Sequence, residues 1–162
     1  MRKFYIFLLI IFLFLVFYAV VIKGMRFYEV PSRSMELTLY PLDRFITVKA
    51  RKIHRGDIVV FKDPTEPSSF CVKRVIALAG DKVEIKNGKL YLDDKTQIEP
   101  YVRERIVYLF RAKVVPQNHI FVLGDNRNLS EDSSVWGFLP IENVVGKGVY
   151  MYWPRHRRGP IK

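Results

Sequence analysis

Hydrophobic and polar positions divide the chain into two parts of different character. Residues 4–22 form an unbroken run of nineteen uncharged, mostly apolar residues, preceded by Arg2 and Lys3. At about 1.5 Å per residue, a helix of this length approaches the roughly 30 Å hydrocarbon core of a bilayer. A removable signal peptide has a shorter apolar region, about 7–15 residues, that ends at paired small residues. Residues 19–24 offer no convincing pair of this kind, so we expect residues 1–22 to be a permanent transmembrane anchor.

Residues 23–162 alternate short apolar runs with turn signals, a pattern typical of β-strands. We expect strands over 45–49, 57–62, 70–78, 82–86, 89–92, 119–123 and 144–153. Asn87-Gly88 stands between two alternating runs and predicts a β-hairpin, because a type I′ turn needs positive φ at both central residues. The charged, weakly periodic residues 93–118 are interpreted as a longer connection. The sequence therefore predicts a mainly β protein: one N-terminal transmembrane helix, then a small folded-over β-sheet domain over 23–162.

Charge and composition narrow the classes of partner and cofactor. The net charge of +11 comes from 27 basic and 16 acidic residues and indicates an anionic partner. The sequence contains no helix-turn-helix, RNA-binding aromatic motif or basic stripe, so we expect anionic lipid headgroups rather than nucleic acid. A single cysteine, Cys71, excludes an internal disulfide framework and a cysteine-based zinc site. The three histidines lack ligand spacing, so no metal site is expected.

Two serines lie about ten residues beyond the predicted anchor, in the segment 31–39 with the sequence PSRSMELTL. Serines in such a segment ordinarily form turns, and no Gly-x-Ser-x-Gly elbow surrounds Ser32 or Ser34. A nucleophilic serine also needs a base. A histidine would complete a Ser-His-Asp triad, but spacing alone does not test that arrangement, and we regard it as the weaker hypothesis.

Lys73 is an alternative base. Strand alternation over 70–78 places it on one face with Cys71, Val75 and Ala77, all small or apolar. A lysine there either extends its amine to water or is desolvated, and burial disfavours the charged form. Burial can shift a lysine pKa by several units, enough to make the amine a general base near neutral pH. Considered alone, a structural lysine that reaches solvent is the simpler interpretation.

A third segment, 124–137, begins Gly-Asp-Asn-Arg and is rich in polar residues. Its composition is that of a polar loop after the strand expected over 119–123. Its acidic residues do not have the spacing of a calcium-binding loop.

In this order, Pro-Ser-x-Ser-Met, Lys-Arg-Val and Gly-Asp-Asn-Arg resemble the motifs of bacterial type I signal peptidases, which are membrane-bound serine proteases with a Ser-Lys dyad. The resemblance extends from about residue 30 to residue 148 and includes 56–61 and 136–140. It implies a mostly antiparallel β catalytic domain on the outer face of the bacterial cytoplasmic membrane. It also implies that the substrates are preproteins whose signal peptides end in small residues, commonly Ala-x-Ala, and that no cofactor or metal is needed.

Carried over by motif position, the resemblance implies a role for each of six residues. Ser34 would be the nucleophile, Lys73 its general base, and Ser32 a hydrogen-bond donor to the oxyanion. Ser130 would orient Lys73, and Arg74 and Asp125 would form a structural ion pair near the site. Side chains two residues apart on an extended segment also point to the same side, so Ser32 and Ser34 would face the same oxyanion.

The chain departs from the family pattern at three positions. The family often has proline where Leu37 stands, aspartate at Asn128 and arginine at Ser134. The last change removes the usual partner of Asp132, so we expect that ion pair to be absent or to be supplied by another residue such as Arg127.

Three alternatives remain open at this point. One is an organellar or conjugation-associated peptidase of the same type. Another is a cytosolic self-cleaving repressor with Ser-Lys chemistry, which the predicted anchor and the lack of a DNA-binding region disfavour. The third is a membrane-anchored β domain that binds a partner without catalysis. Basic residues flank the apolar run on both sides, so charge does not fix the orientation of the anchor.

Overall fold

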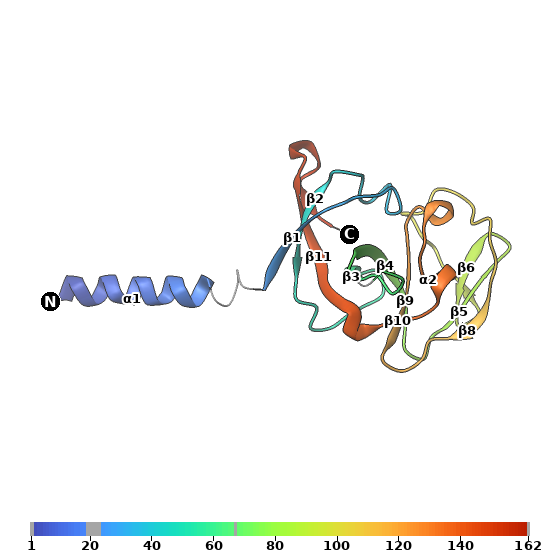
Figure 1. The fold of residues 1–162 in the computed structure, drawn as a ribbon, viewed down its shortest axis with the longest axis horizontal. Helices are drawn as coiled ribbons and strands as arrows, with labels where there is room; N and C mark the ends of the chain where they lie inside the picture. Colours follow the sequence, from blue (N-terminus) through green and yellow to red (C-terminus); the bar gives the residue numbers. More distant parts are fainter. Residues whose placement is uncertain (1, 19–23, 67, 162) are drawn as a thin grey trace.

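Two antiparallel β-sheets form the framework of the chain after residue 24 (Figure 1). The computed structural model describes residues 2–18, 24–66 and 68–161. The larger sheet contains β1 (Met25–Glu29), β2 (Arg44–Val48), β3 (Ile58–Lys62), β4 (Phe70–Leu78), β9 (His119–Leu123), β10 (Leu139–Pro140), β11 (Val144–Trp153) and β12 (Gly159–Pro160). The smaller sheet contains β5 (Lys82–Lys86), β6 (Lys89–Leu92), β7 (Lys95–Thr96) and β8 (Phe110–Val114).

The order of the strands brings distant parts of the sequence together. In the larger sheet it is β1-β2-β11-β3-β4-β9-β10, with β12 beside β11, and in the smaller sheet it is β7-β6-β5-β8. In the described ranges, the short helices are α2 (Ser133–Trp136) and the 3₁₀ turns η2 (Arg127–Leu129), η3 (Ile141–Asn143) and η4 (Arg155–Arg157). Hydrogen bonds join the segment before β2 to the interior strand β4 and to the loop after β9.

The prediction of a mainly β, antiparallel domain is confirmed. The strands with the predicted bounds are β4, β5, β6, β9 and β11. The predicted hairpin is also present: Asn87 and Gly88 have φ of 52° and 75° between β5 and β6. Two full strands, β1 and β8, were not predicted. Both are edge strands in which few residues are buried, so they lack the apolar alternation by which a strand is recognised.

The apolar run at the N-terminus begins with α1 (Arg2–Phe17), whose side chains from Phe4 to Phe17 are between 39% and 67% exposed. We expected a membrane-spanning helix over 4–22, but α1 has 16 residues, and positions 19–22 lie outside the described residues. Among the helices of the described ranges, none combines the length and the hydropathy needed to cross a membrane.

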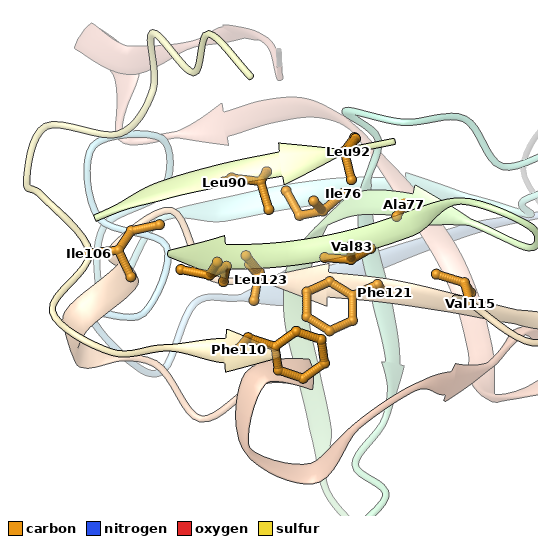
Figure 2. Close-up of a cluster of buried hydrophobic side chains, with 11 residues drawn as sticks. Ile76, Ala77, Val83, Leu90, Leu92, Ile106, Phe110, Val115, Phe121 and Leu123 are labelled. Atoms are coloured by element: carbon orange, nitrogen blue, oxygen red, sulfur yellow. The ribbon is translucent and has the colours of Figure 1, made fainter. Parts of the chain in front are cut away.

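The two sheets pack on each other through a cluster of apolar side chains (Figure 2). It joins β4 and β9 of the larger sheet to the smaller sheet, and Phe121 and Phe110 lie with their ring centroids 4.9 Å apart across it. Burial of a side chain of this size contributes about 1.5–3 kcal/mol relative to leaving it exposed. The cluster therefore fixes the position of β4, which carries Lys73, and of the loop that follows β9.

The predicted face of β4 is interrupted by a bulge. The pairing of β4 with β9 shifts register between Val75 and Ala77. Val75 packs in a second cluster with Phe61, whereas Ala77 belongs with Ile76 to the cluster between the sheets. The expectation that Ala77 shares the face of Lys73 was therefore wrong, because simple alternation ends at the extra residue of a bulge.

Candidate active site

Ser34 and Lys73 lie in contact, although 39 residues separate them along the chain. Ser34 belongs to the turn over 32–39, here called the Ser34 turn, and Lys73 is in the middle of β4. Lys73 Nζ donates a hydrogen bond of 2.7 Å to Ser34 Oγ. Both residues are buried, with 7% of Ser34 and 5% of Lys73 exposed. A hydroxyl and a primary amine are thus held together with little access to water.

Burial lowers the pKa of Lys73 below its ordinary value of 10.5. The cause is desolvation, which penalises the ammonium more than the neutral amine, and it outweighs the opposing attraction of acidic groups such as Asp132. The strand pattern predicted this effect from the apolar neighbours of Lys73. A larger fraction of neutral amine is consequently available to accept a proton than on an exposed lysine.

Cys71 precedes Lys73 by two residues on β4 and remains a neutral thiol. Burial, followed by a hydrogen bond of 3.1 Å from its Sγ to Asp63 Oδ2, raises the pKa of the Cys71 thiol to about 11. A thiolate at this place would attract the ammonium of Lys73 and raise its pKa. Because the thiol keeps its proton at neutral pH, the neutral form of Lys73 is favoured.

The Ser34 turn is anchored by apolar residues and directs polar groups to one place. Met35 and Leu39 are fully buried in a cluster with Phe45, and the N–H of Leu39 donates to the carbonyl of Met35. Ser32 Oγ lies 3.2 Å from Ser34 Oγ. Within the described residues, the backbone N–H of Ser34 donates no hydrogen bond. A hydroxyl and a backbone N–H are therefore available beside the Ser34 side chain.

Leu37 has a φ of 89°, in the region that L-residues rarely adopt. It occupies the third position of a turn closed by the N–H of Thr38 and the carbonyl of Met35. Proline fixes φ near about −65° and cannot adopt this conformation. The leucine at the position where the resemblance led us to expect proline thus accompanies a turn that proline would not permit.

The loop after β9, here called the 124–132 loop, packs against the backbone of the Ser34 turn. The N–H of Asn126 donates to the carbonyl of Ser34 over 3.0 Å. A Cβ added to Gly124 would lie 2.5 Å from the same carbonyl oxygen and would also overlap the side chain of Ser130. The backbone of the loop therefore approaches the Ser34 turn as closely as a glycine allows.

Ser130 is in the 124–132 loop, but it does not make the hydrogen bond that the resemblance implied. Its Oγ is buried and has no hydrogen-bond partner in the described part of the chain. The structure places it against Gly124 rather than on the amine of Lys73. An orienting role for Ser130 remains a prediction.

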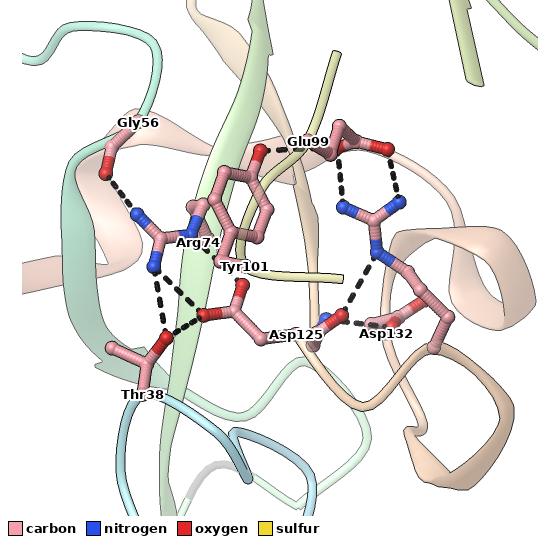
Figure 3. A network of polar contacts seen from close by, with 9 residues as sticks. Thr38, Gly56, Arg74, Glu99, Tyr101, Asp125 and Asp132 are labelled. Atoms are coloured by element: carbon pink, nitrogen blue, oxygen red, sulfur yellow. Dashed lines mark hydrogen bonds and ion pairs between the residues drawn. The ribbon is translucent and has the colours of Figure 1, made fainter. Parts of the chain in front are cut away.

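Arg74 and Asp125 form a buried ion pair beside the site (Figure 3). Arg74 donates from Nε and Nη2 to the two carboxylate oxygens of Asp125, at 2.8 and 2.7 Å. Thr38 Oγ1 donates to Asp125 as well, and Arg74 Nη1 donates to the carbonyl of Gly56. The pair consequently joins β4, the 124–132 loop and the end of the Ser34 turn.

Asp132 has no ion-pair partner among the residues that the structure describes, and hydrogen bonds satisfy its carboxylate. Its carboxylate accepts hydrogen bonds from the N–H of Gly124 at 2.9 Å and from the N–H and hydroxyl of Ser134 at 3.0 and 2.7 Å. Arg127, which we considered as a replacement partner, instead forms two hydrogen bonds to Glu99. Of the two expectations for Asp132, the absence of the ion pair is therefore met and replacement by Arg127 is not, and Ser134 supplies two of the donors to the carboxylate.

Glu99 and Tyr101 contact the arginines around the site and were not among the predicted residues (Figure 3). Both lie in the segment 93–118, which was interpreted as a connection. This segment is irregular around Glu99 and Tyr101 but also contains β7 and β8, so the absence of apolar periodicity concealed both the strands and the packing of these two side chains.

The chain is similar to known proteins over most of its length. The family model "Signal peptidase, peptidase S26" matches residues 1–153. A probable signal peptidase I of Synechocystis is 40% identical over 143 residues, which are 82% of this chain and 73% of that protein. A crystal structure of a signal peptidase I from Enterococcus faecalis superposes with a TM-score of 0.55 at 30% identity, over 60% of this chain and 97% of the other.

A chloroplastic protein is also similar. Thylakoidal processing peptidase 1 of Arabidopsis thaliana is 42% identical over 140 residues, or 78% of this chain, and this chain spans 41% of its length. The resemblance inferred from the three motifs is thus confirmed over most of the sequence. This chain belongs to the signal peptidase family, peptidase S26.

Proposed function

We propose that this protein is an endopeptidase that removes N-terminal signal peptides from exported preproteins, cutting after small residues of the Ala-x-Ala type. Ser34 is its nucleophile and Lys73 its general base. The observation that carries the proposal is the buried contact of 2.7 Å between Ser34 Oγ and Lys73 Nζ in a chain of the signal peptidase family.

The chemistry follows from the groups around that contact. The neutral amine of Lys73 accepts the proton of the Ser34 hydroxyl while Oγ attacks the scissile carbonyl carbon. The resulting oxyanion accepts hydrogen bonds from the N–H of Ser34 and the hydroxyl of Ser32, and loss of one such donor typically costs about 2.7–4 kcal/mol. The ammonium of Lys73 then protonates the leaving amine, and water hydrolyses the acyl-enzyme by the same proton transfers in reverse.

The N-terminal run 4–22 is the single-pass anchor in this proposal, and it places the catalytic domain on the outer face of the cytoplasmic membrane, where preproteins emerge. Two observations support an apolar environment for it: the run has no charged residue, and the apolar side chains of α1 are exposed. Residues 23–33 connect the anchor to Ser34, and an extended chain reaches at most about 3.3–3.6 Å per residue. Ser34 therefore stays close to the bilayer. Tethering raises the effective concentration of nucleophile and cleavage site.

Cleavage of a defined preprotein tests the proposal. Full-length protein in detergent, incubated with a preprotein that carries an Ala-x-Ala junction, should give one product whose new N-terminus follows the second alanine. A matched preprotein with tryptophan in place of that alanine should remain intact, because a bulky side chain does not fit a pocket for small residues. Cleavage of neither preprotein, or of both at equal rates, would contradict the proposed activity.

An organellar processing peptidase is a second candidate, and the 42% identity to the thylakoidal enzyme favours it. The chemistry would be the same and the precursors different. Comparing kcat/KM for a bacterial preprotein and for a thylakoid precursor distinguishes the two substrate classes.

The pH dependence of cleavage should show Lys73 acting as a neutral base. The pKa of Lys73 lies below its ordinary 10.5, and only the form without the extra proton accepts a proton from Ser34. Activity should therefore rise with pH as Lys73 is deprotonated, along a limb centred below pH 10.5. The measurement is kcat/KM across pH for the wild type and for His54→Gln and His119→Gln. A limb that disappears in either histidine variant would contradict the lysine mechanism.

A further inference from the structure

The segment 97–103 passes over the two buried arginines beside the site (Figure 3). Glu99 accepts hydrogen bonds of 2.7 Å from Arg127 Nη1 and 2.5 Å from Arg127 Nη2. The Tyr101 hydroxyl donates to the same carboxylate over 3.0 Å, and its ring lies 4.0 Å from the guanidinium of Arg74. One short segment thus contacts both arginines.

Glu99 compensates a charge that has no access to water. The side chain of Arg127 is 0% exposed and that of Glu99 is 10% exposed. Burial alone would lower the pKa of Arg127, but the hydrogen bonds and charge of Glu99 reverse the effect and raise it. A guanidinium buried at this depth is costly without a paired carboxylate, and the bidentate geometry also fixes its orientation.

The orientation of Arg127 determines the position of the 124–132 loop. Arg127 Nε donates to the carbonyl of Gly124 over 3.0 Å, while the N–H of Gly124 is bound by Asp132. Two residues further along, the N–H of Asn126 donates to the carbonyl of Ser34. Hydrogen bonds therefore lead from Glu99 through Arg127 to the carbonyl of Gly124, and the backbone from 124 to 126 connects that carbonyl to the N–H that binds Ser34.

We propose that Glu99 is a positioning residue for Ser34: through Arg127 it holds the 124–132 loop against the carbonyl of the nucleophile, and Tyr101 orients its carboxylate. The catalytic consequence rests on the proposed peptidase function. The mechanical part, fixation of the loop, does not depend on that function.

The test compares Glu99→Gln with a matched control, Glu84→Gln, in the full-length protein. Glu84 forms an ion pair of 2.6 Å with Lys86 in the smaller sheet, away from the site. In Glu99→Gln we expect kcat to fall by up to about 10²-fold, because small displacements of reacting groups are that costly, while KM stays within about twofold. Amide hydrogen exchange over 124–130 should become faster in Glu99→Gln and stay unchanged in Glu84→Gln.

A double variant separates positioning from general stability. Glu99→Gln alone leaves the buried charge of Arg127 unpaired and should lower the thermal midpoint, whereas Glu99→Gln with Arg127→Met removes both charges and should restore it towards that of the wild type. The hydrogen bond to Gly124 is then missing, so kcat should remain low and exchange over 124–130 fast. Recovery of kcat together with stability would overturn the proposal, as would wild-type kcat in Glu99→Gln.

The exchange experiment also separates this inference from the proposed function. If the wild type cleaves no preprotein and Glu99→Gln still loosens 124–130, the peptidase function fails and the support of the loop stands. If the wild type cleaves and exchange over 124–130 is the same in both proteins, the positioning role is refuted.

Discussion

Ser34→Ala and Lys73→Met are each expected to reduce kcat/KM for preprotein cleavage by about 10⁴-fold or more, because nucleophile and base act as a unit. For the same reason, the double variant Ser34→Ala with Lys73→Met should have a kcat/KM no lower than that of the less active single variant. The contact of 2.7 Å between the two side chains makes each dependent on the other: without the amine the hydroxyl keeps its proton, and without the hydroxyl the amine has no proton to accept. Initial rates with a preprotein substrate measure the loss.

These variants should remain folded, so that lost activity reports lost chemistry. Lys73 is buried and its ammonium is disfavoured, and methionine fills a similar volume without a charge. The thermal midpoint of Lys73→Met should therefore equal or exceed that of the wild type. Lys62→Met, at an exposed position of the neighbouring strand β3, is the matched control and should cleave normally. A folded Lys73→Met protein that kept a tenth of the wild-type rate would refute the dyad.

The sequence was most informative where side-chain alternation matches burial. In β9 a run of apolar residues ends at the glycine of the 124–132 loop, and the structure has the same bounds. In β4 the alternation placed Lys73 correctly beside Val75, but it failed at Ala77 because a bulge depends on pairing with a second strand. The edge strand β8 buries one residue, so its sequence lacks the alternation of apolar and polar residues by which a strand is recognised.

The site could be assembled in advance only where motifs mark its residues. Ser34 and Lys73 were chosen by motif, and the structure brings them together. The partner of Arg127 was not found, because Glu99 lies 28 residues away in a segment without periodicity, and an ion pair leaves no pattern in sequence. The absence of an ion pair at Asp132 was one of two stated expectations, but its actual donors, two backbone N–H groups and the Ser134 hydroxyl, could not be chosen from side-chain types alone.

Gly124→Ala is expected to be the most damaging substitution outside the dyad, with kcat reduced by about 10²-fold or more because the reacting group is displaced. Gly124 is not among the residues with positive φ, so alanine could adopt its backbone conformation. Space is the obstacle: the added Cβ would lie 2.5 Å from the carbonyl oxygen of Ser34, which is backbone and can move only by shifting the nucleophile. Overpacking of this kind also destabilises a fold by about 1–3 kcal/mol.

A second glycine separates displacement of the nucleophile from loss of stability. Gly80 has a φ of 92° in the turn between β4 and β5, and a Cβ there would meet nothing within 4 Å. Gly80→Ala should therefore destabilise the fold through backbone strain alone, by about 1 kcal/mol or more, and leave kcat unchanged. Steady-state kinetics and thermal unfolding of both variants give the comparison. If Gly124→Ala lost stability but kept the kcat of the wild type, the close approach of the 124–132 loop would have no part in holding Ser34.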